Sequence, residues 1–185
     1  MPGPLSQAQL DEFERKGFLF IPNLIEGTEL DELRRKMQVL MSNDDYRNED
    51  FITEPASQEI CSLFAVHFLS ERLGKLASDE RVAGAVRQII GDDPYVHQSR
   101  INYKPGFAGK GFNWHSDFET WHSEDGMPAM HVVSASLILT NNHEFNGPLM
   151  LIPGSLNKFL PCQGETPEDN HKSSLKAQEV GGGEP

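Results

Sequence analysis

Two segments of alternating polar and apolar residues enclose a polar loop near the middle of the chain, and this arrangement most limits the possible folds. The first segment covers residues 94–107 and ends at a Pro-Gly pair, and the second covers residues 132–140. Because side chains alternate across a strand, each segment predicts a strand with one polar and one mostly apolar face. Two such strands around a polar loop predict the wall of a small β-barrel, with polar chemistry at its mouth.

The loop between these strands contains His115 and Asp117, two residues apart. An extended backbone points both side chains to the same side. One imidazole and one carboxylate are two of the three ligands in the 2-His-1-carboxylate triad that binds non-haem Fe(II). On these residues alone, the alternative is a hydrogen-bonded structural pair. The polar faces of the two strands could also simply be exposed to solvent, without lining a site. Their residues are Gln98, Arg100, Asn102 and Lys104 on the first strand and Ser134 and Ser136 on the second.

The amino-terminal half predicts mainly helices. Ser6 and Gln9 form an S-x-x-Q capping box, which begins a short helix that turns Leu10 and Phe13 toward the core and ends at Gly17. Apolar residues at helical spacing predict further helices. The first is capped by Thr28 and turns inward Leu30, Leu33, Met37 and Leu40. A second helix begins near Ser70, and a third covers residues 78–90, ends at Gly91 and turns inward Val82, Val86 and Ile89.

Several shorter segments predict strands and loops. Residues 18–21 predict a buried strand ended by Pro22, and residues 59–68 predict another strand. The polar residues 42–58 between them predict a surface loop. Farther along, Asn146-Gly147 predicts a tight turn between the strand that ends at Thr140 and a strand over residues 149–152.

Composition excludes some classes of protein. A chain of 185 residues predicts one domain with its own core. The formal net charge of −12 argues against a nucleic-acid partner, because a phosphate backbone repels an acidic surface. The absence of an apolar run of about eighteen residues argues against a membrane span, and the amino terminus resembles no secretory signal. Cys61 and Cys162 lie far apart in the sequence, which predicts free thiols in a reducing cytoplasm.

Longer motifs carry a specific resemblance. The run NWHSDFETWHSEDGMP, preceded by HQSRINYKPGF and followed by NGPLMLIPGS, closely resembles the ectoine hydroxylases, within the phytanoyl-CoA dioxygenase-like branch of the Fe(II)/2-oxoglutarate oxygenases. FITEPASQEI, LFAVH and CQGETPEDNHKSSLKAQE extend the resemblance over residues 5–179. It implies an α+β fold with a double-stranded β-helix (jelly-roll, cupin-like) barrel core and supporting amino-terminal helices. It also implies one partial domain over residues 1–185, with a helical part at 1–92, barrel strands and site at 93–160, and a loop or lid at 161–185.

The resemblance also implies roles for individual residues. His115 and Asp117 are expected to bind iron. Residues expected to contact 2-oxoglutarate are Lys104, on its distal carboxylate, with Asn102, Phe112 and Ser136. Residues expected to contact the substrate are Gln98, Thr120 and Trp121, whose indole face attracts the delocalised cation of ectoine.

The function implied by the resemblance is hydroxylation of the compatible solute ectoine to 5-hydroxyectoine in osmotic stress. Fe(II), 2-oxoglutarate and O2 are the implied cofactor and co-substrates, and a homodimer is the implied assembly. The family's second iron-binding histidine and a co-substrate arginine would fall beyond Pro185, so the chain is expected to be incomplete at its carboxyl end. Two alternatives stay open: a related oxygenase acting on another small molecule, and an inactive barrel that only binds one.

Overall fold

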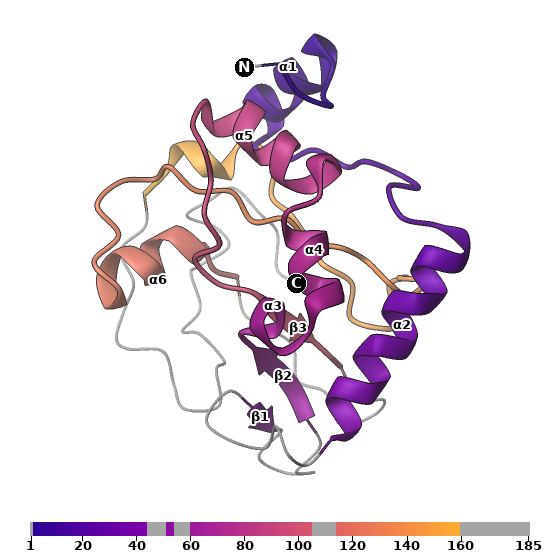
Figure 1. The fold of residues 1–185 in the computed structure, drawn as a ribbon. Helices are drawn as coiled ribbons and strands as arrows, with labels where there is room; N and C mark the ends of the chain where they lie inside the picture. Colours follow the sequence, from indigo (N-terminus) through magenta and orange to yellow (C-terminus); the bar gives the residue numbers. More distant parts are fainter. Residues whose placement is uncertain (1, 44–50, 54–59, 105–113, 160–185) are drawn as a thin grey trace. The chain divides into compact units, whose positions relative to one another are not determined.

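The chain divides into two compact units of interleaved segments. Unit 1 contains Met1–Pro4, Ile21–Lys110 and Ala135–Pro148, and unit 2 contains Leu5–Phe20, Gly111–Ser134 and Leu149–Pro185. A computed structural model of the protein describes residues 2–43, 51–53, 60–104 and 114–159, with their helices and strands labelled in Figure 1. None of the helices in these ranges is both long and apolar enough to cross a membrane.

A three-stranded antiparallel sheet lies in unit 1. Its order is β1 (Phe51–Thr53), β2 (Ile60–Phe64) and β3 (Arg100–Asn102), with β2 in the middle. Leu63 of β2 pairs with Ile101 of β3, and the next pair along joins Ser62 to Asn102. Three consecutive residues of β2, from position 61 to 63, are buried. Side chains alternate between the two faces of a strand, so both faces of β2 are covered.

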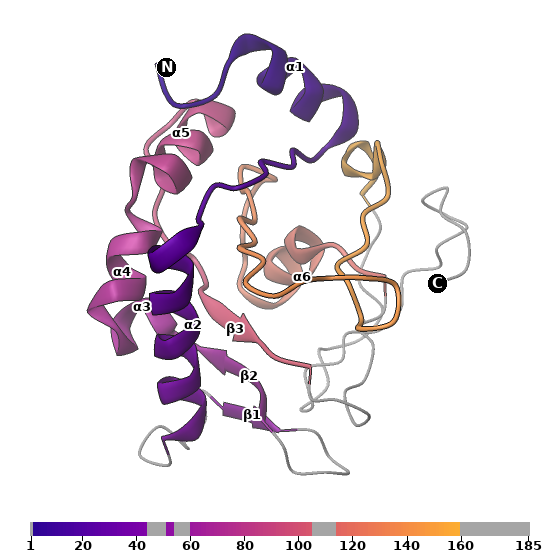
Figure 2. The same ribbon diagram turned by 90° about the vertical axis from the view of Figure 1, so that its right-hand side faces the viewer.

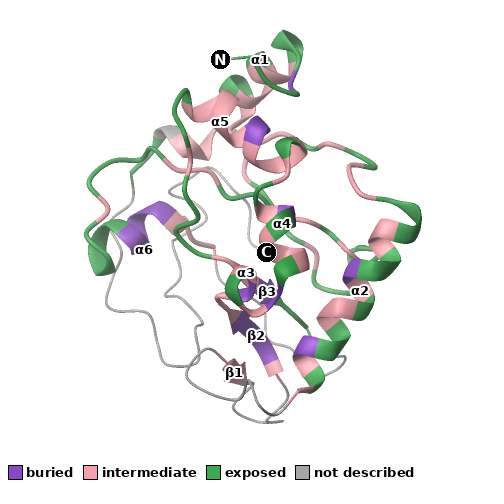
Figure 3. Cartoon of the chain, in the orientation of Figure 1, coloured by how far each residue is buried: buried purple, intermediate pink, exposed green. Residues whose placement is uncertain are grey.

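The core of unit 1 is where helix α2 (Gly27–Ser42) meets this sheet. Leu40 of α2 packs in one apolar cluster with Leu63, Val66 and Ile101. Leu33 lies seven positions before Leu40 and is also buried, as expected for one face of a helix. Figure 2 shows α2 alongside the strands, and Figure 3 shows the buried positions on β2 and along one side of α2.

Four short helical segments follow β2. They are α3 (Val66–Leu69), α4 (Glu71–Ala77), a π-helical segment over Glu80–Gly84, and α5 (Ala85–Ile90). The Ser70 hydroxyl accepts the Leu73 N–H and caps α4, so the predicted start near Ser70 is confirmed. The helix predicted over residues 78–90 exists, but its first turns are π-helical and Asp79, not Ser78, is its N-cap. It ends at Gly91 as predicted.

An ion-pair network joins α2 to these helices. The Glu29 carboxylate accepts hydrogen bonds from Arg72 at 2.7 Å and from Arg81 at 2.8 Å. Arg81 also donates to the Asp79 carboxylate at 2.7 Å. Hydrogen bonds from Arg81 are the main cause that lowers the pKa of Glu29 from 4.5 to about 2, and Arg81 likewise lowers the pKa of Asp79 to about 2. Both carboxylates are therefore charged across the whole neutral and mildly acidic range.

Unit 2 begins with helix α1 (Gln7–Lys16), where the predicted capping box is present. The Ser6 hydroxyl accepts the Gln9 N–H, and the Gln9 side chain accepts the Ser6 N–H. The helix ends as predicted at Gly17, which has a left-handed backbone with φ 83°. A side chain there would collide with Leu156, which belongs to the short 3-10 helix Ser155–Asn157. Glycine at position 17 therefore allows the left-handed end of α1 and also leaves room for the Leu156 side chain.

Three predicted strands are absent from the described part of the chain. Residues 18–21, 132–140 and 149–152 lie there without strand pairing, and the strand predicted over residues 94–104 is reduced to β3. Phe20, predicted to be buried, is 74% exposed. An alternating pattern indicates two faces, but a strand also needs a neighbouring strand for its backbone hydrogen bonds. In the described ranges the sheet is small and open, and the predicted barrel wall is not closed.

Three further expectations were wrong in detail. Thr28 does not cap α2, because Gly27 already begins the helix and Glu26 is its N-cap. The loop predicted over residues 42–58 contains strand β1. The loop predicted after His115 is largely helix α6 (Asp117–Glu124). Phe112, Cys162 and the predicted lid over residues 161–185 lie outside the described residues.

Candidate functional site

His115 and Asp117 lie together in unit 2, as their spacing predicts. His115 Nε2 is 3.6 Å from Asp117 Oδ1, and their side chains are 22% and 31% exposed. Ser116 between them is extended, with φ −114° and ψ 137°, and it is the N-cap of α6. The two side chains therefore share a side because of one extended residue, after which the chain turns into a helix rather than continuing as a strand.

A contact with Ser134 orients the Asp117 carboxylate. The Ser134 hydroxyl donates to Asp117 Oδ2 at 3.0 Å, while the other carboxylate oxygen faces His115. Asp117 is also the first residue of α6, where the positive end of the helix favours a negative charge. The sequence indicated Ser134 only as a member of a polar strand face, so its partner was missed. A hydrogen bond of this kind holds a metal-binding carboxylate in one orientation.

The donor set fits a divalent transition metal in part. An imidazole nitrogen and a carboxylate oxygen, partly buried and adjacent, are ligand types that suit Fe(II). Among the residues that the structure describes, no group of three His, Cys, Asp or Glu side chains lies close enough to hold a metal ion. The described part of the site thus provides two side chains of the kinds found in a facial triad.

Helix α6 carries two of the predicted substrate contacts. Thr120 and Trp121 follow Asp117 by three and four positions, which places them on the same side of the helix as Asp117. Both are buried, Trp121 being 8% exposed. The helix itself was missed, although Ser116 and Glu119 form the S-x-x-E pattern that often begins a helix. One rigid element therefore presents a metal-ligand candidate and an aromatic side chain together.

The end of α6 is held by its own local contacts. The Trp121 carbonyl accepts N–H groups from Asp125 at 3.0 Å and Met127 at 3.1 Å. His122 Nδ1 lies 2.6 Å from the Met127 carbonyl, and its ring contacts Phe118 and Phe159. These contacts fix the helix that carries Asp117 and Trp121. His122 is thereby a structural residue, as is usual for a histidine in an aromatic cluster.

Of the other predicted contacts, Gln98, Asn102, Lys104 and Ser136 belong to unit 1. Asn102 ends β3, and its side-chain oxygen accepts the Ser62 hydroxyl at 3.0 Å. Gln98, Lys104 and Ser136 are exposed. Gln98 precedes β3 and is followed by Ser99, whose hydroxyl lies 2.5 Å from His67 Nδ1 and accepts the His67 N–H at 3.2 Å. These two contacts tie the backbone next to Gln98 to helix α3.

The pair of partly buried donors and the aromatic helix define a candidate non-haem iron enzyme. Comparison with known proteins is consistent with this class: the phytanoyl-CoA dioxygenase (PhyH) family matches residues 13–181. The chain belongs to this family.

Individual relatives give a finer comparison. The chain is 67% identical over 180 residues to the ectoine dioxygenase of Halomonas elongata, covering 97% of this chain and 54% of that protein. It is 52% identical over 181 residues to the ectoine dioxygenase of Streptomyces coelicolor, covering 97% of this chain and 60% of that one. The chain thus spans little more than half the length of these relatives.

Solved structures give the same picture. The crystal structure of EctD from S. alaskensis with 2-oxoglutarate and 5-hydroxyectoine matches with a TM-score of 0.86 and 40% identity, over 96% of this chain and 61% of that one. The structure of the same protein with bound Fe matches with a TM-score of 0.66 and 42% identity, over 70% of this chain and 46% of that one. These matches support the predicted fold class, of which the described residues contain the open three-stranded sheet and its helices.

Proposed function

We propose that the protein hydroxylates ectoine to 5-hydroxyectoine, with Fe(II) as cofactor and 2-oxoglutarate and O2 as co-substrates, in protection against osmotic stress. The single observation that carries the proposal is the His115–Asp117 pair, because it supplies iron-ligand chemistry at the start of a helix with a buried tryptophan. The 67% identity to an ectoine dioxygenase supports the choice of substrate.

In this proposal His115 and Asp117 would hold the iron, and the Ser134 hydroxyl fixes the Asp117 carboxylate. Bound Fe(II) supplies the activation of dioxygen that hydroxylation of a C–H bond requires. The protein's own residues orient the reactants and exclude water. In the resembled family a histidine is the third ligand.

The co-substrate is proposed to bind through Lys104, whose ammonium pairs with the distal carboxylate of 2-oxoglutarate. Lys104 and Asn102 lie two residues apart at the end of β3, so an extended backbone would point both to one side. Ser136 and Phe112 complete the proposed set. Lys104 is exposed, so its ammonium is accessible to a ligand.

The substrate is proposed to lie against Trp121, with Gln98 and Thr120 as hydrogen-bonding residues. Ectoine carries a delocalised positive charge, which is attracted to the face of an indole ring. Trp121 is buried, and an attraction of this kind is stronger where water is excluded. The aromatic side chain also has few rotatable bonds, so it can orient one C–H bond at little entropic cost.

The remaining expectations extend the same proposal. The barrel core is proposed to be a double-stranded β-helix, and the assembly to be a homodimer. We also propose a cytoplasmic location, because a reducing compartment suits the buried Cys61 thiol.

The test is anaerobic titration of the native protein with Fe(II), followed by addition of 2-oxoglutarate. We expect the visible absorption band of the Fe(II)–2-oxoglutarate chelate, and then succinate formation that depends on ectoine. Succinate formation with another small molecule but not with ectoine would favour a related oxygenase. Ectoine binding without the band would favour an inactive binding protein.

A further inference from the structure

The turn that precedes Pro148 in unit 1 is fixed by one asparagine. Asn146 N–H donates to the His143 carbonyl at 3.1 Å, and His143 N–H donates back to Asn146 Oδ1 at 2.9 Å. Asn146 Nδ2 also donates to the Asn141 carbonyl at 2.6 Å. The turn predicted at Asn146-Gly147 is present one step earlier: its central residues are Glu144 and Phe145, and the strands predicted on either side of it are absent. Three hydrogen bonds of Asn146 therefore hold the backbone of this turn in one conformation.

The side chain of Lys104 lies across the next residue of this turn, Gly147. A Cβ atom at Gly147 would lie 2.8 Å from Cδ and 2.8 Å from Nζ of Lys104, and 3.4 Å from Cε. Real Cβ atoms essentially never approach other heavy atoms within 3.0 Å. Any side chain at position 147 would therefore displace the lysine. Because the displaced atoms are the far end of a flexible side chain, they can move without disturbing the fold.

Backbone conformation alone does not account for this contact. Gly147 has φ +68°, a conformation that favours glycine. Gly91 has φ +74°, yet a Cβ there would meet nothing within 4 Å. The left-handed backbone is thus the reason for glycine at position 91. At position 147, glycine also leaves the space that the Lys104 side chain fills. The two glycines form a matched pair in the same unit.

We propose that Gly147 is a positioning residue for Lys104: the bare backbone of the turn directs the lysine ammonium toward the distal carboxylate of 2-oxoglutarate. The inference rests on the proposed function, in which Lys104 binds that carboxylate. A lysine side chain has four rotatable bonds and is poorly oriented by itself. A lysine side chain that packs on a fixed backbone has already lost part of this freedom, so it loses less conformational entropy when it binds the carboxylate.

The first experiment compares Gly147→Ala with Gly91→Ala in the native protein loaded with Fe(II). Both changes place an alanine on a left-handed backbone, but only the first displaces Lys104. We expect Gly147→Ala to raise KM for 2-oxoglutarate by about tenfold, as for a weakened charge-assisted hydrogen bond. We expect kcat at saturating 2-oxoglutarate and KM for ectoine to stay unchanged, and Gly91→Ala to leave KM for 2-oxoglutarate at the wild-type value.

A second variant separates contact from backbone strain. Asparagine adopts the left-handed conformation more readily than alanine but still has a Cβ. Gly147→Asn should therefore raise KM for 2-oxoglutarate while unfolding at a temperature closer to wild type than Gly147→Ala. In a Lys104→Ala background, neither change at position 147 should raise KM further, because the displaced group is absent.

A measurement on the metal-free protein supplies an independent readout. Lysines carrying ¹³C-labelled methyl groups give one resonance each by NMR, and the Lys104 resonance is assigned by its loss in Lys104→Arg. We expect it to shift in Gly147→Ala and not in Gly91→Ala. An unshifted resonance, or a Gly147→Ala effect that persists without Lys104, overturns the positioning role alone. Failure of the wild-type protein to bind 2-oxoglutarate overturns the proposed function, and this extension with it.

Discussion

Strand β2 and helix α6 both bury consecutive residues, but α6 buries the larger polar side chains. β2 buries one small polar side chain, Ser62, whose hydroxyl donates to Asn102. β2 lies within an apolar cluster to which α2 contributes Leu40 and β3 contributes Ile101. α6 buries Phe118 and Trp121, and between them the polar Glu119 and Thr120. Burying polar groups costs free energy that burying apolar groups does not. The comparison separates a region that stabilises the fold from a region whose composition is better explained by binding.

The largest expected effect is on the helix side of this comparison. Asp117→Ala removes one of two adjacent iron-ligand candidates, so we expect iron binding and turnover to be lost, by at least about a thousandfold in turnover. The unfolding temperature should change little, because Asp117 is partly exposed. Anaerobic Fe(II) titration and succinate assays measure the first effect, and thermal unfolding the second.

Asp125→Ala is the matched control for this prediction, since Asp125 lies at the opposite end of the same helix. It should keep its iron affinity. An Asp117→Ala protein that binds iron normally would contradict the iron assignment, and with it the contrast between α6 and β2.

The next effect concerns stability. Leu63 is fully buried, at 0% exposure, in the middle strand of the sheet. Leu63→Ala should lower the free energy of unfolding by about 3 kcal/mol, from lost burial and from the cavity that is left. Urea unfolding followed by circular dichroism measures this. Leu149→Ala is the control: Leu149 is exposed, so the change should stay within about 0.5 kcal/mol. Equal effects at the two positions would contradict the assignment of β2 to the core.

A smaller effect is expected from the contact that orients the Asp117 carboxylate, a candidate metal ligand. Ser134→Ala removes the hydroxyl that donates to Asp117 Oδ2. We expect iron affinity to fall by about tenfold, as is typical when a hydrogen bond to a ligand is removed. Ser123→Ala, at an exposed position on α6, should leave it unchanged. If both variants bind iron equally well, the orientation of Asp117 does not depend on Ser134.

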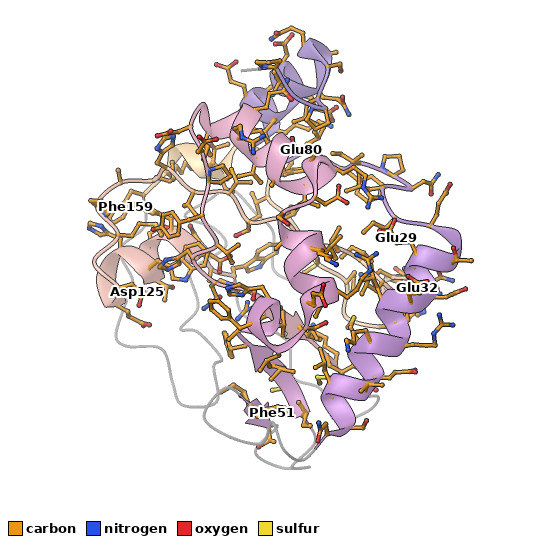
Figure 4. The ribbon with its side chains drawn as sticks, in the orientation of Figure 1. Glu29, Glu32, Phe51, Glu80, Asp125 and Phe159 are labelled. Carbon is orange, nitrogen blue, oxygen red and sulfur yellow. The ribbon has the colours of Figure 1, made fainter. Side chains whose placement is uncertain are left out.

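The smallest expected effect is a dependence of stability on pH. The pKa of Glu29 is lowered on folding from 4.5 to about 2, chiefly by Arg81. A carboxyl whose pKa falls on folding stabilises the folded state above its unfolded pKa, and this contribution is lost as the pH drops toward about 2. The unfolding temperatures of wild type and Glu29→Gln should therefore differ at pH 7, and the difference should shrink as the pH falls from 4.5 to about 2. Glu32→Gln, an exposed position on the same helix (Figure 4), is the control and should follow wild type throughout.

Local information in the sequence was sufficient for some elements. The capping box of α1 depends on residues three positions apart, so Ser6 and Gln9 could predict it. The same holds for the ends of α1 and α5 at Gly17 and Gly91. Local information was insufficient for β1, whose existence depends on pairing with β2, and for residues 132–140, where alternation predicted a strand without naming a partner.

The candidate site shows the same division. The closeness of His115 and Asp117 could be predicted because only one residue separates them. The hydrogen bond from Ser134 to Asp117 joins residues 17 positions apart, and the contact between Lys104 and Gly147 joins residues still farther apart in the sequence. Such contacts are set by tertiary structure, and no spacing rule covers them. A polar residue on a strand face indicates only that a partner exists somewhere.

The placement of Asp117 and Trp121 on one helix has a consequence for how such a site can evolve. Four residues of an α-helix span about 6 Å along its axis, and that spacing is fixed by backbone hydrogen bonds. Under the proposed function, a mutation at position 121 would therefore change which small molecule is held without moving the residue at position 117. Conversely, a change in the backbone before α6 would move both together. Substrate preference can then diverge through single side-chain replacements while the oxidation chemistry is inherited unchanged.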